Sequence, residues 1–193
     1  MSNDLRWRIV VLQVVLIIIF AFGAGIGAWA HNFTHDQVAS QLSGQQIVFP
    51  AANSAAIKAL PAADASAMTQ YANQTMTTGD QAHVYAEHFI AVHLGLIGQG
   101  KAYDYFSGKS IAEATSNRTQ SAADEATALT LFRGDTLRAL LDQAWAFWFI
   151  GEIALYACIG LIAAAVVAFL SLLFEVFVAP KHLAASPLVA AAA

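Results

Sequence analysis

Two long apolar runs constrain this chain more than any other feature. The first, residues 9–29, has Gln13 as its only polar side chain, and the second occupies residues 145–178. Since an α-helix rises ~1.5 Å per residue, a helix of about 20 residues crosses a hydrocarbon core of ~30 Å. Each run is therefore predicted to span a membrane, and a single soluble domain is excluded.

The ends of the spans are predicted from tryptophans and carboxylates, which favour the membrane–water interface. In the second run, Glu152 and Glu175 enclose a stretch one membrane thick, so both are predicted to lie at interfaces. The alternative makes Glu152 a buried proton or ion ligand, because ionisable groups inside spans are functional candidates by default. The predicted boundary residues are Trp7, Trp29, Trp145, Trp148, Glu152 and Glu175.

The flanking basic residues predict the orientation. Arg6 and Arg8 precede the first span and Lys181 follows the second, which places both termini in the cytoplasm of a multi-pass protein of the cell membrane. The predicted organisation is a cytoplasmic N-terminus (1–8), transmembrane helix 1 (9–29), an extracytoplasmic helical module (30–144), transmembrane helix 2 with its outer extension (145–178) and a cytoplasmic tail (179–193). A cleaved signal peptide is the alternative for the first run, because residues 28–30 have the small-x-small form of a cleavage site.

Composition limits the partners. Charged residues make up 11% of the chain, whereas soluble domains average roughly a quarter. The net charge of −4 comes with no basic run, which argues against nucleic acid and leaves the lipid bilayer, other membrane subunits or a second copy. The single cysteine, Cys158, excludes an intramolecular disulfide and is interpreted as a packing residue.

The polar middle section is predicted to be helical, which makes the chain an all-α membrane protein whose two spans extend outward as stalks. We expect the first helix to continue to about residue 42, and another to begin at an Asp80 cap and end near Ile97. Ser110 and Glu113 form a capping-box pattern that predicts a further helix start. Helical stretches over 51–60 and 62–77 and a long final helix from about residue 121 complete the module.

Histidines provide the candidate metal site. His31 and His35 lie four residues apart, so a helix places both on one face, and His83 and Glu87 share a face of a later helix. His88 and His93 point away from that face. A fold that brought the four residues together would bind a transition metal; no other cofactor is predicted. Catalytic motifs such as His-Glu-x-x-His are absent from the sequence, so no catalytic residues are assigned.

Small residues form stripes that allow close helix approach in membranes. The predicted packing positions are Gly23, Ala24, Gly27 and Ala28 in the first span and Gly160 and Ala164 in the second. These stripes either pair the two spans with each other or receive an external helix, and the sequence leaves both readings open.

Three segments carry a family resemblance: residues 46–50 (QIVFP), 85–94 (YAEHFIAVHL) and 100–103 (GKAY). With them, the chain resembles small two-span proteins of high-GC actinobacteria that have an external helical module and no established activity. The resemblance covers most of the chain and implies no functional residues.

These features give three hypotheses. The first is a non-catalytic accessory or assembly subunit of a membrane complex. The second is a metal-binding or redox-supporting module anchored by two helices. The third is a homo-oligomeric pore lined by the second span with Glu152 at its mouth.

Overall fold

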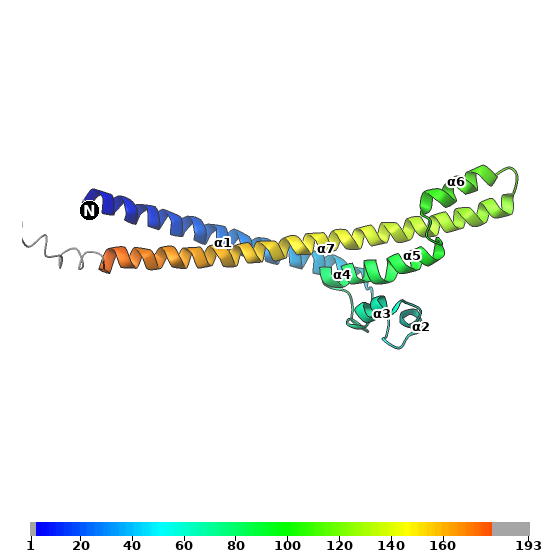
Figure 1. Ribbon diagram of the computed structural model, residues 1–193, viewed down its shortest axis with the longest axis horizontal. Helices are drawn as coiled ribbons and strands as arrows, with labels where there is room; N and C mark the ends of the chain where they lie inside the picture. Colours follow the sequence, from blue (N-terminus) through cyan, green and yellow to red (C-terminus); the bar gives the residue numbers. More distant parts are fainter. Residues whose placement is uncertain (1–2, 179–193) are drawn as a thin grey trace, which may run out of the picture. The chain divides into compact units, whose positions relative to one another are not determined.

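The computed structural model describes residues 3–178, and this part of the chain is all-helical (Figure 1). Its only pairing of β type is an isolated bridge between Val48 and Thr75. The helices in chain order are α1 (Asn3–Gln45), α2 (Ala55–Lys58), α3 (Ala62–Thr69), α4 (Gly79–Tyr85), the π-helical η1 (Ala86–Ile90), α5 (Ala91–Ile97), α6 (Tyr103–Glu113), α7 (Arg118–Leu173) and the π-helical η2 (Phe174–Val178). The predicted cytoplasmic tail, with Lys181, lies outside the described residues.

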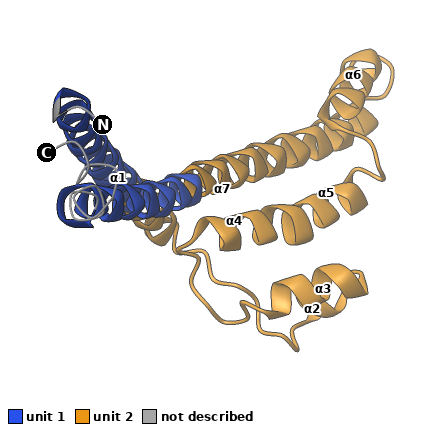
Figure 2. Ribbon diagram, turned by 60° about the vertical axis from the view of Figure 1, so that its left-hand side comes forward, with its two compact units in different colours: residues 1–33, 151–193 blue, residues 34–150 orange. Residues whose placement is uncertain are grey.

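Two compact units make up the chain (Figure 2). Unit 1 contains the N-terminal residues up to 33 and the C-terminal residues from 151, and unit 2 contains residues 34–150. Both α1 and α7 are much longer than a membrane span requires, because α1 has 43 residues and α7 has 56. The prediction that each apolar run continues into the polar section as one helix is thus confirmed.

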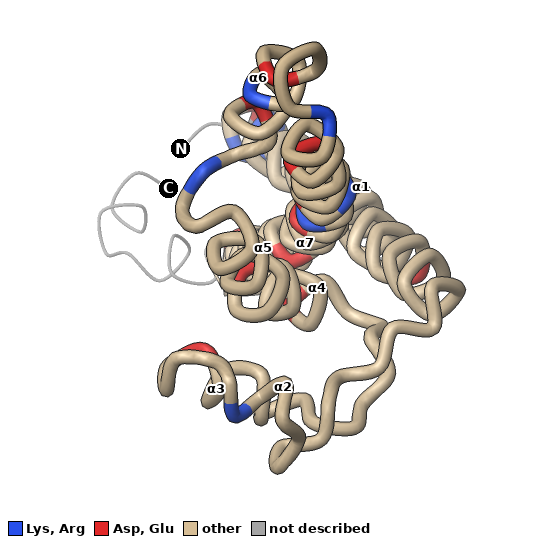
Figure 3. Tube along the Cα trace, turned by 90° about the vertical axis from the view of Figure 1, so that its right-hand side faces the viewer, with Lys and Arg blue, Asp and Glu red and all other residues tan. Residues whose placement is uncertain are grey.

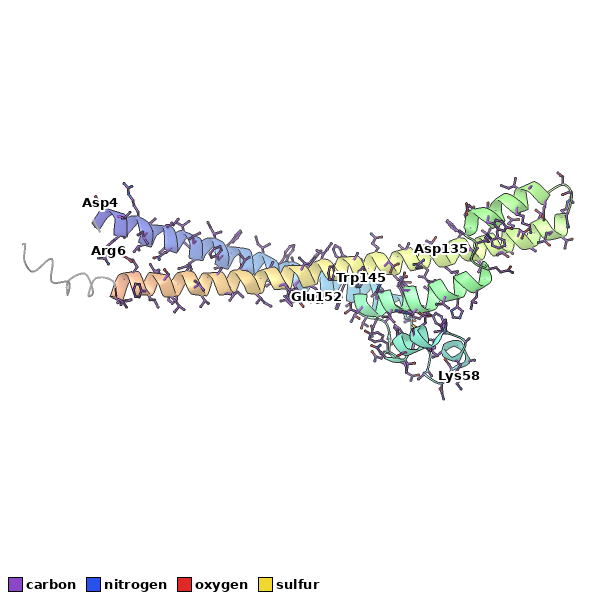
Figure 4. The ribbon with its side chains drawn as sticks, viewed as in Figure 1. Asp4, Arg6, Lys58, Asp135, Trp145 and Glu152 are labelled. Atoms are coloured by element: carbon purple, nitrogen blue, oxygen red, sulfur yellow. The ribbon has the colours of Figure 1, made fainter. Side chains whose placement is uncertain are left out.

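Unit 1 pairs the apolar segments of α1 and α7 as antiparallel helices. Near the start of α1 (Figure 4), Arg6 donates from Nε to Glu175 Oε1 over 3.0 Å, and at the other end His31 Nδ1 lies 3.1 Å from the Gly151 carbonyl oxygen. In the most apolar window of each helix only 6% is buried within the protein. The core helix of a soluble protein is mostly buried, and these two windows are not. By their length and composition, α1 and α7 can each cross a membrane.

Unit 2 folds around a nearly continuous helix formed by α4, η1 and α5. This helix runs along α7, and α2 and α3 lie on its other side (Figure 2). The Phe49 ring, 1% exposed, contacts the rings of Tyr71 and Tyr85 at the centre of the unit. The buried core consists of Val38, Leu42, Phe49, Ile57, Leu60, Met68, Met76, Ala82, Ala86, Ile90 and Leu141. Lys58 of α2 points away from this core (Figure 4).

The helices predicted over 51–60 and 62–77 are shorter in the structure, as α2 and α3. The second ends at Thr69 because the following residues pair in extended conformation with residues 47–49. The amide of Phe49 donates to the Gln74 carbonyl over 2.9 Å, and that of Met76 donates to the Ile47 carbonyl over 2.8 Å. This pairing satisfies the backbone hydrogen-bonding groups next to the buried side chains of Phe49 and Met76. Helix propensity, a property of each residue by itself, does not include this stabilisation.

Two predicted caps are wrong. The helix after residue 78 is capped by Thr78, which forms a complete capping box with Gln81, and Asp80 lies inside the first turn. Ser110 and Glu113 do not open a helix, since both lie in the last turns of α6. The Ser110 hydroxyl instead lies 3.3 Å from the Ser121 hydroxyl of α7, so Ser110 takes part in the contact between α6 and α7. The start of α7 is capped by Asn117, whose Oδ1 accepts from the Gln120 amide.

Candidate functional site

Polar side chains tie α4 and η1 to α7 within unit 2. Arg138 binds Glu87 through two parallel hydrogen bonds, from Nε to Oε1 over 2.8 Å and from Nη2 to Oε2 over 2.9 Å. One turn away on both helices, His83 Nδ1 lies 3.1 Å from Asp142 Oδ1, and its ring stacks on Trp145 with centroids 4.4 Å apart. A bidentate Arg–carboxylate pair has a fixed geometry, so these contacts set the register of the two helices.

The other face of η1 is held by α3. His88 Nδ1 lies 2.7 Å from Asp64 Oδ1, whereas His93 Nδ1 is 2.7 Å from the Phe89 carbonyl of its own helix. His83 and His88 contact different helices, α7 and α3, which is consistent with their predicted placement on different faces. The π-helical turn is therefore anchored on two sides, to α7 by Glu87 and to α3 by His88. π-Helical turns are frequent at functional sites.

Each of the four predicted metal ligands has a side-chain neighbour in the structure. Within unit 2, His83 and Glu87 share a face as predicted, but each has the partner on α7 described above. His35 stacks on Trp148 at 3.5 Å between centroids. In unit 1, ligand atoms of His31 and Glu152 lie within 4.8 Å of each other. Both oxygens of Glu87 accept from Arg138, so metal binding there requires that ion pair to open; the metal site remains a prediction.

A second polar cluster joins α6 to the beginning of α7, where basic and acidic residues alternate (Figure 3). Lys109 Nζ lies 3.2 Å from Oδ2 of Asp124, whose residue is only 4% exposed. The Lys109–Asp124 hydrogen bond raises the pKa of the Lys109 ammonium. In the core, burial raises the pKa of the Tyr85 phenol. Both groups have a structural role, because Lys109 joins α6 to α7 and Tyr85 packs on Phe49.

A mainly apolar groove of about 570 Å³ lies wholly within unit 2. It lies between the outer section of α1 and α7. Every lining residue is uncharged: Gln37, Val38, Gln41, Leu42, Gln45, Ile47, Leu137, Leu140, Leu141, Gln143, Ala144, Ala146, Phe147 and Ile150. Leu140 is 58% exposed although it is a large aliphatic residue. The groove lining is mainly apolar and includes the side-chain amides of Gln37, Gln41, Gln45 and Gln143.

Sequence reasoning did not predict this groove. Its signal was the spacing of Gln37, Gln41 and Gln45, which places three amides along one face of α1. Leu137 and Leu140 belong to an apolar helix face, and helical spacing identifies such a face without showing what covers it.

The predicted small-residue positions behave differently in the two helices of unit 1. A Cβ on Gly27 would lie 2.9 Å from the Ala154 carbonyl oxygen and 3.0 Å from Cys158 Cβ, and one on Gly23 would lie 3.0 Å from Leu161. Ala24 is also buried. These residues allow α1 to approach α7, which supports the internal reading for the first stripe. Gly160 is exposed and has open space around it, while Ala28 and Ala164 line two grooves on the surface of unit 1.

Gly27→Leu and Gly25→Leu provide a matched test of this helix pairing. We expect Gly27→Leu to separate the two helices of unit 1, because its side chain meets backbone atoms of α7 that cannot rotate away. Gly25→Leu enters open space and should be tolerated. Disulfide cross-linking between single cysteines placed at positions 16 and 168 measures the pairing. Equal cross-linking in both variants would contradict the close approach at Gly27.

The predicted boundary residues fall into two groups. Trp7 and Trp29 are 69% and 65% exposed and lie roughly 33 Å apart along α1, which matches a membrane thickness. Glu175 is neutralised by Arg6. In unit 2, the Trp145 and Trp148 rings pack on histidines, so these two tryptophans have a packing role in addition to any position at the interface.

Comparison with known proteins identifies no relative: no family model, no curated protein and no solved structure matches the chain.

Proposed function

We propose that this protein is a non-catalytic accessory or assembly subunit of a cell-membrane complex. Unit 1 crosses the membrane twice with both termini in the cytoplasm, and unit 2 forms the extracytoplasmic module. The exposed apolar surfaces of α1 and α7 and the spacing of Trp7 and Trp29 support the membrane placement. The flanking Arg6 and Arg8 support the orientation.

The groove of unit 2 is the observation that carries the accessory role. Its lining is uncharged and includes the exposed side chains of Leu137 and Leu140. An apolar groove of this kind between two helices can bind the apolar face of a third helix. The amides of Gln37, Gln41 and Gln45 can hydrogen-bond uncharged polar side chains beside such a face. We therefore assign the groove to an amphipathic helix, without charges on its docking face, from a partner subunit.

The contacts of the acidic residues in unit 2 also support a non-catalytic role. Glu87, Asp142, Asp64 and Asp124 each contact a basic side chain of another helix, and so serve to hold the module together. Catalytic acids and bases are typically set apart by strongly perturbed pKa values in a cleft. The charged pairs of unit 2 lie outside the uncharged groove.

Leu140→Glu tests the assigned surface. We expect this variant to lose a stoichiometric partner, because a carboxylate would be buried against an apolar helix face, whereas Ile111→Glu on α6 should retain it. Ile111 is 75% exposed and lies outside the groove. Native mass spectrometry of the tagged full chain, extracted gently from its own host, measures the subunit ratio, and elemental analysis of the same sample measures bound metal.

Unrelated subunits at a fixed ratio that disappear only in Leu140→Glu would support the proposal. A complex that survives this substitution would overturn the assignment of the groove. A bare homo-oligomer would favour the pore hypothesis, and one equivalent of metal would favour the metal-binding hypothesis.

A further inference from the structure

A histidine of α1 and a glutamate of α7 lie close together in unit 1. Ligand atoms of His31 and Glu152 are within 4.8 Å of each other, and both residues are partly buried. Two ligands of one tetrahedral zinc ion, each ~2.1 Å from the metal, lie roughly 3.4 Å apart. Small rotations of the two side chains therefore bring both ligand atoms to coordination distance.

A backbone hydrogen bond orients the His31 ring. Its Nδ1 lies 3.1 Å from the Gly151 carbonyl oxygen, and because a carbonyl oxygen can only accept, Nδ1 carries the proton. The neutral ring therefore has its lone pair on Nε2. Metal-binding histidines almost always donate their other ring nitrogen in this way, which fixes the ring orientation and increases its basicity. Since Gly151 directly precedes Glu152, the same contact holds the ring at the level of the carboxylate.

The helix α1 provides a second imidazole. His35 follows His31 by four residues in one uninterrupted helix, so both side chains project from the same face of α1. His35 stacks on Trp148 through the face of its ring. A metal binds a ring nitrogen in the plane of the ring, so stacking and coordination are compatible. Two imidazoles and one carboxylate form one of the ligand sets that bind Zn²⁺ in proteins.

We propose that His31, His35 and Glu152 bind a divalent transition-metal ion such as Zn²⁺. Through His31 and Glu152 the ion links α1 to α7 within unit 1, and three protein ligands leave a fourth position for water. The inference goes beyond the proposed function and does not depend on it, because an accessory subunit can bind its partner with or without a metal.

His83 provides the matched control, because the sequence suggests it as a ligand together with Glu87. Both oxygens of Glu87 accept from Arg138, so that pair can bind a metal only if the ion pair opens. The side-chain nitrogen of asparagine takes a position close to that of Nδ1 in histidine. His31→Asn therefore keeps a donor for the backbone carbonyl and removes only Nε2, and His83→Asn makes the same change in unit 2.

The experiment uses the full chain in detergent, with its affinity tag removed and bound metal extracted by a chelator. Calorimetric titration with Zn²⁺ alone measures stoichiometry and affinity, and we expect one equivalent per chain in the parent and in His83→Asn. His31→Asn, His35→Phe and Glu152→Gln should each weaken zinc binding by more than the roughly 10–100-fold that loss of a residue orienting a ligand costs. His35→Phe retains an aromatic ring to stack on Trp148, and Glu152→Gln retains the side-chain volume.

A parent chain that binds no stoichiometric zinc would overturn the proposal, and this criterion does not depend on the folding of any variant. An unchanged affinity in His31→Asn or Glu152→Gln would also overturn it, since zinc would then bind elsewhere on the chain. Loss of zinc in His83→Asn alone would assign the metal to the other candidate ligands instead. The Leu140→Glu test of the groove involves none of these residues, so failure of the metal site and failure of the proposed function are distinguishable.

Discussion

Phe49→Ala is expected to destabilise unit 2 by about 3–5 kcal/mol, the usual cost of removing a fully buried aromatic side chain. Phe49 is 1% exposed and contacts both Tyr71 and Tyr85, so the substitution leaves a cavity between aromatic rings. Domains are stable by only about 5–15 kcal/mol, so the loss is a large fraction of the total. Val48→Ala is the matched control, since Val48 is adjacent and 54% exposed.

Urea denaturation in mild detergent, followed by tryptophan fluorescence, measures this effect. In a Trp7→Phe, Trp29→Phe background the remaining signal comes from Trp145 and Trp148, which pack inside unit 2. We expect a much lower urea midpoint for Phe49→Ala and a nearly unchanged one for Val48→Ala. Equal midpoints for the two variants would show that Phe49 is not in the core.

Gly79→Ala and Gly95→Ala are expected to change stability in opposite directions. A Cβ on Gly79 would lie 2.3 Å from Cβ and 2.5 Å from Cγ of Trp148, so α4 and α7 must separate. Overpacking of this kind costs about 1–3 kcal/mol. Gly95, inside α5, has nothing within 4 Å, and alanine there should stabilise by about 0.5–1 kcal/mol because it restricts the unfolded chain.

The same fluorescence assay compares the two glycine variants. Their opposite signs separate the packing requirement at Gly79 from the helix-propensity gain at Gly95, because propensity alone would not favour glycine over alanine at either position. A Gly79→Ala protein as stable as the parent would show that α4 does not approach α7 as closely as the structure has it.

Helical periodicity determined much of the fold from the sequence alone. The length of each apolar run predicted two helices able to cross a membrane, and the five-residue steps from His83 to His88 and from His88 to His93 predicted different faces. Both follow from the fixed rise and turn of an α-helix, which depend only on neighbouring residues. The cap at Asp80 was mispredicted because the nearby Thr78 has similar capping ability. Ser110 was mispredicted because α6 begins earlier, after Ala102, without a side-chain cap.

Only the tertiary structure decided which distant residues meet. Arg138 is 51 residues from Glu87, and Asp142 is 59 residues from His83, so their pairing depends on the register of two separate helices. In unit 1, the register of α1 against α7 places Gly27 against α7, leaves Gly160 open, and forms the Gln13–Ser171 pair. A sequence specifies the faces that each helix presents, whereas the partner of each face results from the packing of the whole chain, because that packing minimises buried voids and unsatisfied polar groups together.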